Sequence, residues 1–227
     1  MLAVAPPIAT FAHRYEVVET IQFCLLAFAL PALVVVGWPL RWLRGRALHG
    51  LFDRAVRIAD ARRRHPSTAR SLSFVVIDVA LVIAWRTPAL MDALERHAWV
   101  LAAELVSLTF GGILVWVELV RCPPLEPRLP RPRRAVMAAV SMWAAWTTAY
   151  VVGFSQVSWY AAFHHVAGGL GASADQELST GLLWFGAAAA FLPVIFTDLV
   201  AWLRNGEDPD AELRALVRRE KWWGPPR

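Results

Sequence analysis

Long runs without a charged residue dominate the hydrophobic pattern of this chain. Residues 21–40, 135–163 and 178–197 hold no Asp, Glu, Lys or Arg and are mostly apolar. A helix needs about 20 apolar residues to cross the hydrocarbon core of a bilayer, and each run reaches that length. The pattern therefore predicts helices that cross a membrane, and it excludes an ordinary soluble domain.

Five membrane crossings are predicted, over residues 20–43, 71–91, 98–120, 135–153 and 179–203. The second is the weakest, because its clearly apolar part ends at Trp85 and covers only about 22 Å. It reaches residue 91 only by continuing through Pro88, where we expect a kink. The prediction is an all-α, polytopic helical bundle, with one transmembrane domain over residues 1–203 and a charged tail over residues 204–227.

The distribution of basic residues predicts the orientation of the bundle. The chain is 57% apolar and 18% charged, with a net charge of +5 and an isoelectric point near 10.0. Of its 23 basic residues, 20 lie in residues 41–70, 121–134 and 204–227. The other three are Arg14, Arg86 and Arg96. The positive-inside rule then predicts an extracytoplasmic N-terminus and a cytoplasmic C-terminus. Because the basic charge has this topological explanation, no nucleic-acid partner is expected.

One basic connection, residues 48–64, has two interpretations. Its apolar residues among many arginines suit an amphipathic helix that lies on anionic lipid. They suit equally a solvated loop that helps to set the topology.

The predicted outer side gathers histidines, carboxylates and a thiol. Carboxylate and imidazole together suit divalent metal ions, and a nearby thiol or thioether favours Cu(I). The candidate metal ligands are Glu19, Cys24, His97, Glu104 and Asp175, with Met91 as a further soft donor. His97 and Glu104 are seven residues apart, which predicts one helix face; a polar seam between helices explains this spacing equally well.

Two further polar features of the outer side have mainly structural interpretations. The adjacent pair His164 and His165 is a weaker candidate for a metal or proton site, because neighbouring residues rarely point at one ion. Glu16 is interpreted as marking the wet end of a helix. A disulfide between Cys24 and Cys122 is not expected, since a membrane thickness separates them.

Asp78 is a separate candidate near the middle of the second predicted crossing. Charged groups at that depth are costly and are usually paired or functional. Helix packing, for example against Thr147 or Thr148, is the favoured interpretation, and a proton or ion role is the alternative. Near the cytoplasmic ends, Glu118 and Asp198 are expected to pair with arginine or to reach toward the interface.

Motifs of the common enzyme classes do not occur. The chain has no Gly-x-Ser-x-Gly, His-Glu-x-x-His, phosphate-loop or dinucleotide-binding pattern. The sequence therefore predicts a protein that is not an enzyme.

The opening of the last predicted crossing carries a family resemblance. Residues 175–184, from Asp175-Gln176 to Trp184, resemble the Asp-Gln-x-Leu…Trp signature of CtaG-type cytochrome c oxidase assembly factors. Other elements resemble the same family in the same order: the helix over residues 24–39, the stretch Trp85-Arg86-Thr87-Pro88, and Glu104 followed by Gly112 and Trp116. Together they cover most of residues 19–203.

The resemblance implies a multi-pass protein of the bacterial plasma membrane that helps to build a haem-copper oxidase. Its partners would be the lipid bilayer and oxidase subunits, and it would handle copper at the outer face. Glu19, His97, Glu104 and Asp175 would form an outer polar pocket, with Gln176 beside Asp175. The family typically has seven crossings, whereas five are predicted here.

The sequence departs from the family at its histidines. The His-x-x-x-His pair of the family falls on Glu19 and Phe23, its Trp-His histidine on Arg86, and its Glu-His histidine on Leu105. Three functions therefore stay open. The chain is an assembly factor that handles copper, a non-catalytic membrane scaffold or partner subunit that has lost metal binding, or a small transporter or channel component that uses Asp78.

Overall fold

The structure, a computed structural model, describes residues 15–37, 49–64, 67–123, 125–155, 158–163 and 171–204. Within these ranges the chain is helical and forms no β-strand. The helices are α2 (Glu16–Cys24), the π-helix η2 (Leu25–Ala29), α3 (Leu30–Gly37), α4 (His49–Arg64), α5 (Thr68–Trp85), α6 (Pro88–Arg96), α7 (Ala98–Leu119), α8 (Arg131–Gly153), the short 3₁₀-helix η5 (Ala161–Phe163) and α9 (Ala172–Arg204).

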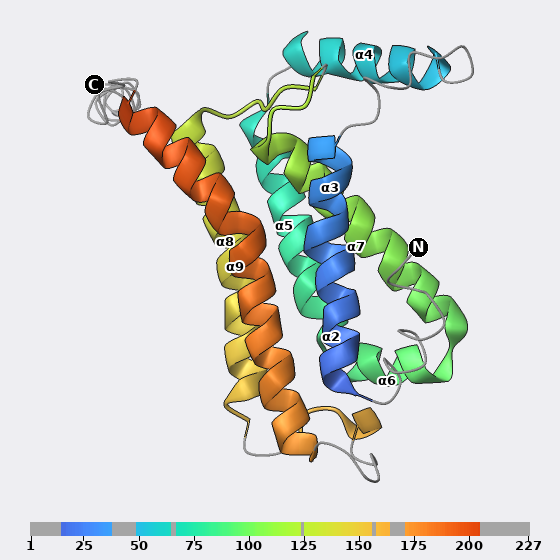
Figure 1. The fold of residues 1–227 in the computed structure, drawn as a ribbon. Coiled ribbons are helices and arrows are strands. Elements are labelled where there is room, and N and C mark those ends of the chain that lie inside the picture. Colours follow the sequence, from blue (N-terminus) through green and yellow to red (C-terminus); the bar gives the residue numbers. More distant parts are fainter. Residues whose placement is uncertain are drawn as a thin grey trace, which may run out of the picture.

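Five helical segments of the described chain are long and apolar enough to cross a membrane. They are Glu16–Gly37, formed by α2, η2 and α3 together, and the helices α5, α7, α8 and α9. This confirms the predicted all-α bundle of five spans. Helix α4 lies across one end of the bundle and α6 lies at the other (Figure 1). We call these the α4 end and the α6 end.

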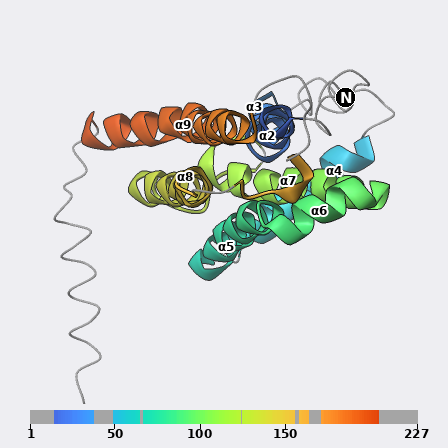
Figure 2. The ribbon, with the colours of Figure 1, turned by 90° about the horizontal axis from the view of Figure 1, so that it is seen from below.

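The spans pack in successive layers. Seen along the bundle, α9 and the first span form one layer, α8 and α7 the next, and α5 lies beyond them (Figure 2). Helices α8 and α9 pack against each other most extensively, and α2 packs on α9. Aromatic rings join the layers, because Phe191 of α9 stacks on Trp116 of α7 and meets Phe28 of η2 edge-on. The core of the described bundle is therefore continuous from the first span to the last.

The second span is shorter than predicted. The expected continuation through Pro88 to residue 91 is wrong, because α5 ends at Trp85 and a separate helix, α6, begins at Pro88. Thr87, the residue before the proline, is extended, as the bulk of the proline ring requires. Its hydroxyl donates to the carbonyl of Ala84 at 2.7 Å. This turn places Arg86 at the end of the bundle, facing inward.

The first span contains a proline that shapes it. Pro31 has no N–H to donate to the preceding turn, and the π-helix η2 ends two residues before it, at Ala29. Pro31 packs against Gly112 of α7, where a Cβ atom would approach the proline Cγ to 2.5 Å. The span begins at Glu16, four residues earlier than predicted, and residues 38–43 lie outside the described chain.

Helix α4 shows that the basic connection is helical over residues 49–64. Ala59 is buried against the bundle, whereas Ile58 is exposed. Arg62 donates to the carboxylate of Glu118 on α7 at 2.9 Å, and Arg128 lies 3.4 Å from the same carboxylate. The fully buried Glu118 thus ties α4 to the bundle, which confirms its expected pairing with arginine.

Candidate functional site

The polar residues of the α6 end meet around one ion pair. Arg86, in the turn between α5 and α6, donates through Nη1 to Oε2 of Glu19 on α2 at 2.7 Å. Its guanidinium carbon lies 4.2 Å from the centre of the Phe23 ring, so the cation also rests on an aromatic face. Glu19, Phe23 and Arg86 are three of the positions at which the resembled family carries histidine. In this chain they contact one another.

Arg86 is only 4% exposed, and protein groups contact both its side chain and its backbone. Its backbone carbonyl accepts a hydrogen bond from the hydroxyl of Tyr160 at 3.0 Å. Burial raises the pKa of this hydroxyl, so Tyr160 stays protonated and able to donate. Burial alone would lower the pKa of Arg86, but the neighbouring groups, Glu19 first among them and then Tyr160, Cys24 and Glu104, together outweigh burial and raise the pKa. The guanidinium is therefore a permanent buried cation.

Two further carboxylates surround this cation without pairing directly with it. Glu16 and Glu104 are 1% and 2% exposed, and each has one carboxylate oxygen without a hydrogen-bond partner. Both interact electrostatically with Arg86. The interpretation of Glu16 as the wet end of a helix is wrong, because α9 and the turn at Arg86 cover the start of α2. The described cluster holds more carboxylates than cations, so an added proton or neutral donor would relieve it.

The Asp175-Gln176 motif has a structural task. Both oxygens of Asp175 accept from the first backbone N–H groups of α2, those of Glu16 at 2.7 Å and Val17 at 3.0 Å. Asp175 on α9 therefore caps α2 from another helix, which satisfies N–H groups that a helix start leaves open. Gln176 joins two other segments, because it accepts from the backbone N–H of Trp159 at 2.7 Å and donates to the carbonyl of Val152 at 2.8 Å.

These residues do not fit copper as a cargo. Asp175 has committed both oxygens to the cap, and Glu19 faces the fixed cation Arg86, which would repel a second cation. Cys24 lies beside α9, with its sulfur 4.0 Å from the carbonyl oxygen of Leu182. Among the residues that the structure describes, no three His, Cys, Asp or Glu side chains come together as a metal-binding group. Metal binding by the predicted set stays a prediction that the arrangement does not favour.

The predicted pairing of His97 with Glu104 does not form. His97 precedes the first turn of α7 in an extended conformation, with φ −140° and ψ 110°, so helical spacing does not relate it to Glu104. It is exposed and stacks on Trp99, whereas Glu104 points into the core. Met91 is buried with Tyr160 and Phe163 in a small apolar cluster. His164 and His165 lie outside the described residues.

Asp78 lies apart from this cluster. It is buried between α5 and α8 beside Ser141. The hydroxyls of Thr147 and Thr148 bond to carbonyls of their own helix, so neither is the predicted partner. The position agrees with a role in helix packing, and a proton or ion role stays a prediction.

Sequence reasoning missed the residue at the centre of the site. The sequence marks Arg86 as one of three basic residues outside the predicted cytoplasmic segments and as a departure from the family pattern, and an arginine beside many carboxylates at one end of a bundle is a signal for an ion pair. Tyr160 lies in a long uncharged stretch, and nothing in the local pattern marks it. The structure places Glu19, Glu104, Asp175 and Gln176 at the same end of the bundle.

Comparison with curated proteins gives no match, and comparison with solved structures gives none either. The model of one protein family, described as cytochrome c oxidase caa3 assembly factor, matches residues 1–205. That match covers all five spans, the ion pair at the α6 end and the cap that Asp175 provides. The chain therefore belongs to the cytochrome c oxidase caa3 assembly factor family.

Proposed function

We propose that this protein serves oxidase assembly as a membrane scaffold that holds an oxidase subunit, and that it does not carry copper at the α6 end. One observation carries the proposal. The ion pair of Arg86 and Glu19, resting on Phe23, stands where the resembled family has histidines. A guanidinium fixed by the chain supplies positive charge among the carboxylates, and it does so without any exchangeable ion.

Electrostatics supports this choice over copper handling. An incoming cation would have to separate Glu19 from Arg86, and breaking one side of a buried ion pair costs roughly 3–5 kcal/mol. The stacked Phe23 offers no ligand atom. The two open carboxylate oxygens, on Glu16 and Glu104, are hard donors, whereas Cu(I) prefers thiolate and thioether.

We further propose that the α6 end faces away from the cytoplasm in the bacterial plasma membrane. The support is the charge of the two ends. Arginines of the α4 end include Arg62, Arg121, Arg128, Arg131 and Arg134, whereas the described part of the α6 end holds Arg86 and Arg96. The orientation is tested with single cysteines at the exposed positions Arg96 and Glu126, after both natural cysteines are replaced by alanine. An impermeant maleimide added to intact cells should label Arg96→Cys and spare Glu126→Cys; the reverse result contradicts the orientation.

The function itself is tested in a strain that lacks the gene. We expect reduced oxidase haem absorbance in that strain, restoration by the wild-type chain, and co-purification of an oxidase subunit with it. Copper titration of the purified protein should give no stoichiometric binding. An unchanged oxidase in the deletion strain would overturn the assembly role. Stoichiometric copper that Glu19→Gln abolishes would instead support the copper carrier.

A further inference from the structure

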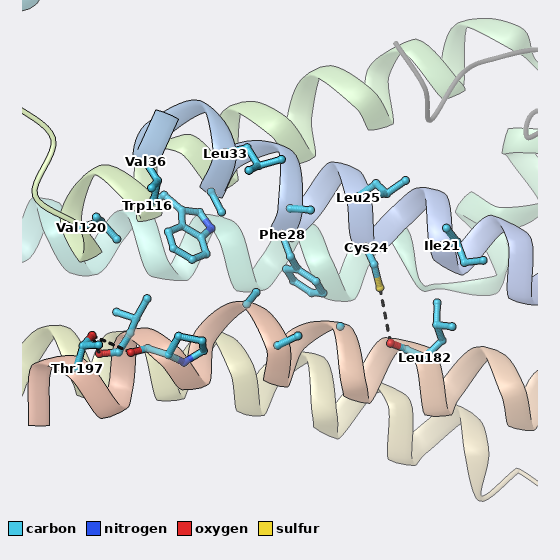
Figure 3. Close-up of a pocket in the computed structure, with 17 residues that line it drawn as sticks. Ile21, Cys24, Leu25, Phe28, Leu33, Val36, Trp116, Val120, Leu182 and Thr197 are labelled. Carbon is cyan, nitrogen blue, oxygen red and sulfur yellow. Dashed lines mark hydrogen bonds between the residues drawn. The ribbon is translucent and has the colours of Figure 1, made fainter. Parts of the chain in front are cut away.

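A long apolar groove separates the first span from α9 on the lipid-facing side of the bundle. Its volume is about 610 Å³. One wall is formed by α2, η2 and α3, and the other by α9. Trp116 of α7 and Val120, which directly follows α7, lie at the floor near the α4 end. Figure 3 shows the groove running from Ile21 and Leu182 to Val36 and Thr197.

The groove exists because the two helices separate toward the α4 end. Helix α2 packs directly on α9, whereas α3 packs on α7 instead, and the two ribbons diverge in Figure 1. The α9 wall includes the small residues Gly186, Ala189 and Ala190, whose side chains leave the groove open. A Cβ atom at Gly186 would lie 2.9 Å from the sulfur of Cys24, so even one methyl group would crowd this end.

The length and the lining of the groove indicate what kind of molecule suits it. The wall from Ile21 to Val36 rises about 22 Å at 1.5 Å per residue, and apolar side chains line nearly all of the groove. This length and lining suit a hydrocarbon chain laid along the two helices.

One polar group in the groove lacks a partner. The indole N–H of Trp116 is buried and makes no hydrogen bond with any residue that the structure describes, although the side chain is only 4% exposed. An indole N–H can only donate, so it calls for an acceptor such as a carbonyl oxygen. Thr197 is already committed, since its hydroxyl donates to the carbonyl of Pro193 at 2.7 Å. Trp116 lies one turn from the end of α7, near the α4 end of the groove.

Basic residues stand beyond that end of the groove. Arg121 is exposed and directly follows Val120, which lines the groove. Arg131 donates to the carbonyl of Ala201, one turn past Thr197. The groove thus has arginines at its α4 end, the indole N–H of Trp116 next and apolar side chains beyond. An anionic phospholipid has its groups in the same order: phosphate, ester carbonyl and hydrocarbon chain.

We propose that the groove binds one acyl chain of an anionic glycerophospholipid. The chain runs from Trp116 toward Cys24, the ester carbonyl accepts from Trp116 Nε1, and the phosphate lies near Arg121 and Arg131. The lipid fills the gap between the first span and α9 and so couples the two helices. This inference is independent of the proposed role in assembly.

The test is lipid retention, measured by native mass spectrometry of the full chain after delipidation in detergent and titration with phosphatidylglycerol or phosphatidylcholine. We expect one tightly bound phosphatidylglycerol per chain. Ala190→Phe narrows the groove and should abolish binding, whereas the matched change Ala80→Phe, at an exposed position on α5, should leave it unchanged. Trp116→Phe keeps the ring, removes the donor and should weaken binding about fivefold to tenfold.

Circular dichroism and thermal unfolding identify a variant that fails to fold. If Ala190→Phe does not fold, the test uses two other proteins: the single variant Trp116→Phe and the double variant with Arg121→Gln and Arg131→Gln. Wild-type chain that retains no lipid would overturn the proposal, and so would equal binding by wild type and Ala190→Phe. Equal affinity for the two lipids would overturn the headgroup contact. A quinone, a partner helix or a second copy found in place of lipid would overturn the assigned occupant.

Discussion

The two ends of the bundle both bury charged residues, but they balance charge in opposite ways. At the α6 end, Arg86 alone among the described cations faces Glu16, Glu19 and Glu104, so carboxylates outnumber the cation. At the α4 end, arginines outnumber carboxylates in the buried pairs. There Glu118 holds Arg62 and Arg128, while Asp198 holds Arg134. Both ends leave some guanidinium nitrogens and carboxylate oxygens without a partner among the described residues.

This difference indicates different tasks for similar chemistry. The arginines of the α4 end share few carboxylates and have long side chains, so we expect them to exchange a protein partner for water or lipid phosphate more readily. Arg86 has no such freedom, because Phe23, Glu19 and the bond from Tyr160 enclose it. We therefore expect the α6 end to be rigid and intolerant of charge changes, and the α4 end to be adaptable.

The strongest way to break the comparison is to remove the cation of the α6 end. Arg86→Met leaves Glu19 buried and unpaired, and we expect a loss of roughly 3–5 kcal/mol in the free energy of unfolding. Denaturation in mixed detergent micelles measures the loss. The double variant Arg86→Met with Glu19→Leu should recover most of it. Equal stability of wild type and single variant would contradict a rigid, charge-dependent end.

The matching change at the α4 end should have a smaller effect. Glu118→Gln removes the counter-charge of Arg62 and Arg128 but keeps an oxygen that can accept from them, so we expect a loss of about 1–3 kcal/mol. Protease cleavage within α4 should also become faster, since Arg62 ties that helix to the bundle. Glu126→Gln, an exposed neighbour, is the control. A loss as large as that of Arg86→Met would remove the contrast between the ends.

The cap on α2 tests the α6 end without touching its ion pair. Asp175→Ala should cost about 1 kcal/mol, the usual value of an N-terminal cap. Asp175→Asn keeps one acceptor oxygen and should cost less. The same unfolding assay applies, with the exposed neighbour Glu177→Gln as the control. An Asn variant as unstable as the Ala variant would contradict this, and it would show that the cap needs both acceptor oxygens of Asp175.

Asp78 provides the smallest expected effect, because it belongs to neither end. Asp78→Asn preserves shape and removes a charge from the apolar interior, so we expect a change below about 1 kcal/mol. Proton flux into liposomes that contain the protein should not differ between wild type and variant. Flux by the wild type that the variant abolishes would revive the transporter alternative.

The parts of the fold that follow from local pattern were predictable from sequence. Apolar runs of sufficient length marked the five spans, and Pro88 marked the weak point of the second. The site was only partly predictable. Its acidic members could be assigned to one end, but the partner of each depends on rotation of the helices about their axes. Glu19 meets Arg86 rather than a metal, and His97 turns outward, because tertiary packing sets those rotations and a single sequence does not encode them locally.

The cap that Asp175 places on α2 has a consequence for biosynthesis. The amides of Glu16 and Val17 emerge early from the ribosome, yet the carboxylate that binds them follows 159 positions after Glu16. Until the last span enters the membrane, the first span has an open end and Glu16 and Glu19 lack the cover of α9. A chain that stops before α9 consequently leaves the start of α2 without its cap, and it leaves Glu16 and Glu19 without the cover that α9 gives them.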